Sequence, residues 1–127
     1  MNHHDVPSPP APSYRRQGDL LLLSGQIGVD EHWRPVGGTF QDEAGKAFDN
    51  VRKVLSDAGA QTHHILKVTA YLADMNDFDA YNEVWLAEFP RTRPARTTIG
   101  ATLYPPLRIE LDVIAWVDGA VRGPAGA

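Results

Sequence analysis

The segment that most constrains the fold is the last long apolar stretch of the chain, from Arg108 to Val117. Its residues alternate in the way that is typical of a β-strand whose two faces meet different surroundings. One face is wholly apolar and holds Ile109, Leu111, Val113, Ala115 and Val117. The other face holds Glu110, Asp112, Ile114 and Trp116. Two acids beside an isoleucine and a tryptophan are unusual on a strand face that water covers. We therefore expect a second copy of the chain to cover this face.

Two helices are predicted from apolar residues at helical spacing. The first runs from about Phe40 to Ala58, with Gly59 just past its end. The second follows the polar stretch 74–77 and ends at Pro90. Its aromatic residues share one face, namely Phe78, Tyr81, Trp85 and Phe89. Two such helices can cover only one face of a sheet, which agrees with a partner on the other face.

Four further strands complete the predicted order. They span residues 14–17, 20–25, 65–72 and 96–102, with a hairpin turn at Gly18-Asp19 and a loop over 27–38. The order β-β-α-β-α-β-β predicts one α+β domain over residues 1–127 with both helices on one face of the sheet. Residues 1–12 are rich in proline and residues 118–127 in glycine and alanine, so both ends are expected to be flexible.

Composition excludes several classes of function. With 127 residues, 43% of them hydrophobic and 22% charged, the chain reads as one soluble globular domain. A net charge of -4 disfavours broad binding of nucleic acid. The absence of cysteine excludes disulfides and thiolate catalysis. The five histidines do not form a metal-binding pattern, so no metal is expected. No stretch is apolar enough to be a signal peptide or a membrane span, which predicts a cytoplasmic protein.

Arg96 and Glu110, which fall within two of the predicted strands, are the candidate catalytic residues. An arginine keeps its proton at working pH, so Arg96 could hold a carboxylate in a fork geometry but could not act as a base. A glutamate that is removed from water gains a higher pKa and becomes useful for proton transfer. The alternative is structural: Arg96 could be a surface arginine, or could form an ion pair with Glu110 or Asp112.

Three other residues are weaker candidates for binding. Ser24 and Gly25 end a buried strand, where they could form a plain turn or could line a cleft that glycine allows a ligand to approach closely. Asn82 lies inside the second helix, where asparagine is not favoured. It could be an ordinary exposed residue or a residue near a site.

The chain resembles the YjgF/RidA family, also called the Rid family and long labelled endoribonuclease L-PSP. The matching stretches lie in order over roughly residues 18–117. They are GDL at 18–20, LSGQI at 23–27, AFDNVRKVL at 47–55, KVTAYL at 67–72, YNEVW at 81–85, RPART at 93–97 and IELDVIA at 109–115. Taken together, these motifs are highly specific for the family.

The resemblance implies a chorismate-mutase-like α+β fold with a mixed sheet. It also implies a homotrimer in which three sheets form an inner barrel and ligand clefts lie between subunits. The implied activity is that of a 2-iminobutanoate/2-iminopropanoate deaminase, which hydrolyses reactive enamines and imines to 2-oxoacids and ammonia without a cofactor. The implied partners are further copies of the chain and small 2-imino or 2-oxo acids, with no nucleic acid and no membrane.

Residue by residue, the resemblance implies that Arg96 holds the substrate carboxylate and that Glu110 positions or activates water. Ser24 and Gly25 match cleft-lining residues, and Asn82 matches a helix asparagine near the site. Thr98 stands where the family often has a cysteine, and it is retained as a substrate-binding candidate together with Tyr14. The family's cleft tyrosine ahead of the first strand is replaced here, because that place holds about Pro10 or Ala11.

Three alternative functions stay open at this point. The first is a deaminase of another substrate, such as 2-aminomuconate or aminoacrylate. The second is a non-catalytic trimer that binds small carboxylates, as a regulator or a chaperone-like protein. The third is the ribonuclease activity of the old family label, which the acidic composition disfavours and for which no histidine pair is placed.

Overall fold

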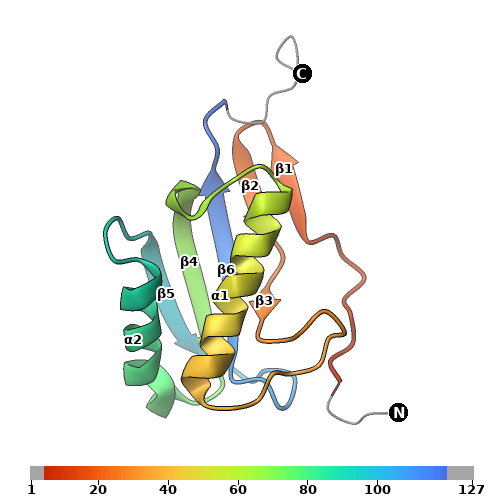
Figure 1. Cartoon of the computed structure of the whole chain (residues 1–127), viewed down its shortest axis with the longest axis vertical. Helices are drawn as coiled ribbons and strands as arrows, with labels where there is room; N and C mark the ends of the chain where they lie inside the picture. The colour runs from red at the N-terminus through yellow and green to blue at the C-terminus, as the bar shows by residue number, and fades with distance from the viewer. Residues whose placement is uncertain (1–4, 120–127) are drawn as a thin grey trace.

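A six-stranded sheet forms one layer of the molecule, and two helices form the other (Figure 1). The computed structural model describes residues 5–119. The strands are β1 (Tyr14–Gln17), β2 (Leu20–Leu23), β3 (Gln26–Ile27), β4 (Ile65–Leu72), β5 (Ala95–Gly100) and β6 (Ile109–Trp116). The helices are α1 (Phe40–Asp57) and α2 (Phe78–Glu88), with short 3₁₀ turns η1 (Thr62–His64) and η2 (Met75–Asp77). The predicted α+β fold with both helices on one face is confirmed.

The strands follow the order β1-β2-β6-β4-β5, and β3 pairs with the far part of β6. β6 is therefore the central strand, and it pairs antiparallel with β2, β3 and β4. β5 pairs parallel with β4, because α2 carries the chain back to the starting end of the sheet. The sheet is thus mixed, and β5 forms one of its edges beside α2 (Figure 1).

Helix α1 begins and ends as its sequence predicts. The Thr39 hydroxyl accepts a hydrogen bond from the Asp42 backbone N–H, and the Asp42 carboxylate accepts one from the Thr39 N–H, which completes a capping box. At the other end Ala58 caps the helix, and Gly59 adopts a φ of 75° that favours glycine. The start of α1 lies close to the start of β6, because the Glu43 carboxylate accepts hydrogen bonds from the Arg108 and Ile109 N–H groups.

The core lies between the helices and the sheet. The apolar face of β6 is fully covered there, as the alternation of its sequence predicts. α2 contributes Tyr81, Trp85 and Phe89, and the rings of Phe48 and Tyr81 stack with centroids 6.5 Å apart. The second face of the sheet has no covering layer within the protomer: Leu22, Ile114 and Trp116 there are 43%, 38% and 47% exposed. Cover by another copy of the chain stays a prediction.

Residues 27–38 had been expected to form a loop. In the structure, Ile27 instead belongs to strand β3 (Gln26–Ile27). The polar residues Ser24 and Gln26 interrupt the leucine run, and a two-residue strand gives too little alternation to be recognised. Val29 then bridges to Pro35, which closes a short hairpin. Ile27 and Val29 build a second apolar cluster with Val6 and Leu107. The structure therefore contains one more strand than the sequence predicts.

The proline-rich segment before β1 lies along this second cluster. Val6 is buried, and its N–H donates to the Trp33 carbonyl (2.9 Å). At the other end of the segment, the Ser24 hydroxyl donates to the Pro12 carbonyl (2.6 Å). Residues 5–12 thus have specific contacts at both ends, whereas the expected flexibility of residues 1–4 and 120–127 concerns positions outside the described residues.

Candidate functional site

Arg96 points from β5 toward helix α2 and not away from the protein. It pairs with Val68, which belongs to the helix-side core, so both side chains lie on that face. The guanidinium carbon lies 5.8, 5.7 and 5.1 Å from the ring centroids of Phe78, Tyr81 and Trp85. Three aromatic rings at this distance attract the cation and restrict its motion. The guanidinium is held in place without being neutralised.

Arg96 and helix α2 carry buried polar atoms that lack a hydrogen-bond partner among the described residues. They are Arg96 Nη1, the Tyr81 hydroxyl and Asn82 Oδ1. Burial raises the pKa of Tyr81 far above its usual value, so its hydroxyl stays protonated. Buried donors and acceptors without partners are costly, and in native proteins they call for a ligand or a neighbour. Thr98, two residues after Arg96, lies on the same face of β5.

Glu110 lies in a separate cavity of about 300 Å³ on the other side of the protomer. Its carboxylate rests against Gly25, where an added Cβ would lie 2.2 Å from Glu110 Oε2. The close approach at Gly25 is therefore made by the Glu110 carboxylate, and the approach of a ligand stays a prediction. The cavity is lined by Val6, Pro7, Pro9, Ala11, Ser24, Gly25, Ile27, Trp33, Tyr104, Leu107 and Glu110.

The electrostatics of Glu110 favour its neutral form. Burial raises the pKa of the Glu110 carboxyl, and the negative charge of Asp112 raises it further. Asp112 has its own partner, because the Tyr71 hydroxyl donates to Asp112 Oδ2 (3.0 Å). Glu110 can therefore exchange a proton at a higher pH than an ordinary glutamate, as a general acid or base requires.

Arg96 and Glu110 do not meet within one protomer. Arg96 shares the helix-side face with Val68, whereas Glu110 pairs with Tyr71 on the opposite face. Neither the described ion pairs nor the described hydrogen bonds join Arg96 to Glu110 or Asp112. The structural alternative of an ion pair is therefore wrong for the protomer. β4 separates the two side chains, and successive residues of one strand point to opposite faces.

The other predicted residues divide between the two places. Thr98 lies on the same face of β5 as Arg96, and Asn82 lies in α2, the helix whose rings surround Arg96, while Ser24 and Gly25 lie with Glu110. Tyr14 joins neither: it pairs with Leu23 and packs against the main core.

Residues that the sequence reasoning missed surround both places. Trp33 and Tyr104 line the Glu110 cavity, and Ala11 lies where the family tyrosine was expected. Tyr81 had been assigned only to the apolar face of a helix. The residues of α2 that face Arg96 follow the spacing i, i+3, i+7, which also describes an ordinary core face, so the sequence held no signal for a cation at that place.

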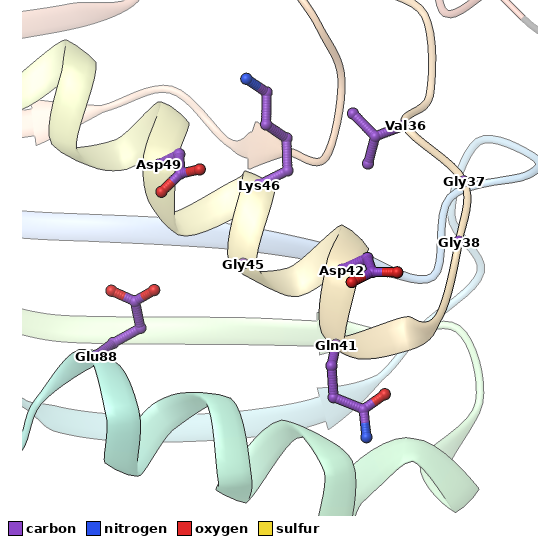
Figure 2. A pocket seen from close by; sticks show the side chains of 9 residues that line it. All are labelled: Val36, Gly37, Gly38, Gln41, Asp42, Gly45, Lys46, Asp49 and Glu88. Atoms are coloured by element: carbon purple, nitrogen blue, oxygen red, sulfur yellow. The ribbon is translucent and has the colours of Figure 1, made fainter.

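A larger hollow of about 530 Å³ lies over the outer surface of α1 (Figure 2). Figure 2 shows the carboxylates of Asp42, Asp49 and Glu88 around it with Lys46 as its basic group. An anionic substrate would meet like charge there, so this hollow does not suit a small acid. Within residues 5–119, no three His, Asp or Glu side chains are grouped to hold a metal ion.

The structure thus shows a small α+β domain in which Arg96 on the edge strand β5 faces helix α2, and in which Glu110, whose pKa is raised, lies on the opposite face of the sheet. The family model described as endoribonuclease L-PSP matches residues 10–117. The chain belongs to this family, which confirms the resemblance to YjgF/RidA proteins.

Individual relatives agree with this membership. The chain is 35% identical over 103 residues to a 2-iminobutanoate/2-iminopropanoate deaminase of Dermatophagoides farinae, covering 80% of each protein. The crystal structure of yeast Mmf1 is similar with a TM-score of 0.83 at 28% identity, covering 90% of this chain and 92% of that one. A structure of E. coli TdcF with bound serine has a TM-score of 0.78 at 28% identity, covering 88% and 91%. Other relatives are named only as a RutC family protein or as a mitochondrial protein.

The location of the protein is not fixed by these relatives. Across residues 5–119, no helix has the length and apolar character that crossing a bilayer needs. Because several relatives carry a mitochondrial name, the cytoplasmic location stays a prediction.

Proposed function

We propose that this protein hydrolyses small 2-imino acids, of the 2-iminobutanoate and 2-iminopropanoate type, to 2-oxoacids and ammonia. The observation that carries the proposal is the guanidinium of Arg96, held among three aromatic rings with a buried nitrogen that lacks a partner. A carboxylate is the ligand that a fixed guanidinium binds best. Relatives named as imine deaminases supply the class of reaction.

The mechanism needs few groups. Arg96 binds the substrate carboxylate and fixes the position of the C=N carbon relative to Glu110. Glu110 in its ionised form accepts a proton from water as the oxygen attacks that carbon, and it passes this proton to the nitrogen, which gives a carbinolamine. Glu110 then accepts the proton of the carbinolamine hydroxyl and donates it to the nitrogen as the C=O bond forms and the C–N bond breaks, so ammonia leaves and the 2-oxoacid remains. No electron leaves or enters, and no cofactor is required.

The complete site is formed by two copies of the chain in a homotrimer. Arg96 and Glu110 lie on opposite faces of one sheet, so a substrate that contacts both must lie between copies. The exposed apolar residues Leu22, Ile114 and Trp116 on the uncovered face support this assembly, since an apolar sheet face is normally covered. The Arg96 half of each site then comes from one copy and the Glu110 half from its neighbour.

The direct test follows the decay of an imine made in situ by a threonine dehydratase. The protein should accelerate formation of 2-oxobutanoate, and Arg96→Ala should lower this acceleration at least about 1,000-fold, because a bidentate charged contact is lost. Glu110→Gln should lower kcat more than it weakens binding of 2-oxobutanoate. Full activity in Arg96→Ala would refute the proposal.

A mixing experiment tests the shared site. Arg96→Ala and Glu110→Gln protomers are unfolded together and refolded, so that mixed oligomers form. A site between copies has both residues intact in about one case in four, because each residue comes from an independent copy. Recovery of about a quarter of wild-type activity supports the shared site. A mixture as inactive as its parents would refute it.

A non-catalytic role as a binder of small amino or oxo acids is the second candidate. It is favoured by the TdcF structure, whose bound serine is an amino acid and not an imine. Calorimetric binding of serine or 2-oxobutanoate that Arg96→Ala abolishes, together with no acceleration of imine hydrolysis, would select this role.

A further inference from the structure

Trp33 has a backbone conformation that is unusual for a large residue. Its φ is 63°, and it is the one non-glycine residue with a positive φ among residues 5–119. This region is strained for a bulky side chain and persists only where the surroundings enforce it. Strain of this kind points to a role for the side chain, because glycine would fit the same backbone without cost.

The hairpin around Trp33 enforces that conformation through hydrogen bonds. The Trp33 N–H donates to the Asp30 carbonyl (3.0 Å), and the Trp33 carbonyl accepts from the Val6 N–H (2.9 Å). Asp30 Oδ1 also accepts from the N–H groups of His32 (2.9 Å) and Arg34 (3.0 Å). Bonds on both sides of residue 33 therefore hold the indole in one direction.

That direction is into the Glu110 cavity. Trp33 packs against the second apolar cluster, which consists of Val6, Ile27, Val29 and Leu107. Trp33 lines the cavity of about 300 Å³ and also a neighbouring one of about 370 Å³ on the α1 side of β3. Residues that line both cavities form the wall between them, so the indole closes the Glu110 cavity on that side.

The Glu110 cavity is larger and more apolar than a short substrate side chain requires. Its volume corresponds to about ten water molecules. If Arg96 of the neighbouring copy holds the carboxylate, then the side chain of the 2-imino acid is the part that enters beside Glu110. A methyl or ethyl group would leave the wall of Ile27, Trp33 and Leu107 in contact with water, whereas an isobutyl or benzyl group would cover it.

We propose that Trp33 determines specificity: the site accepts the short 2-imino acids of the proposed function, but it favours 2-imino acids whose side chain is apolar and has four or more carbons. This inference rests on the proposed function, because it concerns the side chain of the same substrate. Trp33 contacts the part of the substrate that does not react, so it acts on selectivity and not on proton transfer. If the indole only filled the second apolar cluster, then its removal would change kcat/KM equally for all substrates.

The test compares two imines that an L-amino-acid oxidase makes in situ from 2-aminobutanoate and from phenylalanine. Wild-type protein should act on the benzyl imine with the higher kcat/KM. Trp33→Gly and Trp33→Ala should both lower kcat/KM for the benzyl imine about 10-fold or more, and for the ethyl imine less than about 3-fold. Trp33→Phe keeps a ring and should keep most of the preference. His32→Ala changes an exposed neighbour in the same hairpin and should leave both rates unchanged.

The two small substitutions separate the backbone from the side chain. Both remove the indole, but only glycine removes the strain, so Trp33→Gly should be the more stable variant at equal loss of selectivity. A fall of equal size for both imines in these variants, or a wild-type preference for the ethyl imine, would overturn the proposal.

Binding separates this proposal from the deaminase proposal. By calorimetry, phenylpyruvate should bind wild-type protein more tightly than 2-oxobutanoate does, and Trp33→Gly should remove the difference. If this binding difference is found but the protein accelerates the hydrolysis of no imine, then the proposed selectivity of Trp33 is supported and the proposed deaminase activity is refuted. If neither acid binds, or if both bind equally to wild-type protein, then the selectivity is refuted.

Discussion

Two combinations of arginine and glutamate in this small domain, Glu43 with Arg108 and Glu110 with Arg96, have opposite surroundings. Glu43 is 4% exposed at its side chain and accepts hydrogen bonds from Arg108 Nε (2.7 Å), from the Arg108 N–H (2.7 Å) and from the Ile109 N–H (3.3 Å). Arg108 also donates to the carbonyls of Gly38 and Thr39. Arg96 and Glu110 have no such bond to each other, and they lie on opposite faces of the sheet.

The contrast shows how hydrogen bonding distinguishes two kinds of charged group: those that stabilise the fold and those that stay available to a ligand. The carboxylate of Glu43 is fully used in joining the start of α1 to the start of β6, so it has nothing left to offer a ligand. Arg96 is surrounded by aromatic rings instead, and its Nη1 has no hydrogen-bond partner among the described residues. The first pair stabilises the fold, whereas the proposed function assigns the second pair to a substrate.

The largest effect expected from this comparison is on stability. Glu43→Ala should lower the free energy of unfolding by about 3 to 5 kcal/mol, because it leaves Arg108 and two backbone N–H groups without their partner. Glu110→Gln should not lower it at neutral pH. Urea denaturation at one protein concentration measures both. A Glu43→Ala variant as stable as wild type would remove the distinction between the two pairs.

The next largest effect is expected on catalysis, and it compares alanine substitutions at two glycines. Gly25→Ala places a Cβ against the Glu110 carboxylate and should displace it, which should lower kcat about 100-fold, since such chemistry tolerates little misplacement. Gly45→Ala is the matched control, because nothing lies within 4 Å of its added Cβ. It lies within α1 and should raise stability by up to about 1 kcal/mol without changing turnover. Equal activity of the two variants would show that the close contact of Gly25 with Glu110 does not matter for the reaction.

Much of the fold could be read from the sequence, because local periodicity carries it. The alternation in 109–117 and the capping residues Thr39 and Gly59 are local signals, and the structure agrees with them. Strand β3 was missed because two residues carry no period. The packing of α2 around Arg96 was missed for a different reason. The aromatic residues of α2 have the spacing of any core face, and only the pairing of β5 with β4 turns Arg96 toward them.

The candidate site was harder to predict than the fold, because the faces of the strands, and not the spacing in the sequence, decide where its residues lie. Arg96 and Glu110 were expected in one cleft, and the register of β4 with its two neighbours places them on opposite faces. Trp33 and Tyr104 lie in loops whose sequence has no motif, yet they line the Glu110 cavity. Their positions depend on contacts between segments that are distant in sequence, such as that of Val6 with Trp33.

The smallest effect expected is a displacement along the pH axis, and it tests the raised pKa of Glu110. Burial and the charge of Asp112 both raise the pKa of the Glu110 carboxyl. If the ionised form acts as the base, kcat/KM should rise with pH through a pKa above the ordinary glutamate range. Asp112→Asn should move this rise to lower pH, but not fully, because burial is the larger cause.

Stability should change with pH in the opposite sense. A carboxyl with a raised pKa holds its proton more tightly in the folded state than in the unfolded state. Its contribution to stability is therefore complete below the ordinary glutamate pKa and is lost as the pH rises through the raised value. Glu110→Gln should make this part of the stability curve flatter than that of wild type. A kcat/KM profile that rises in the ordinary glutamate range, with the same stability curve in both proteins, would show that Glu110 is an ordinary surface acid.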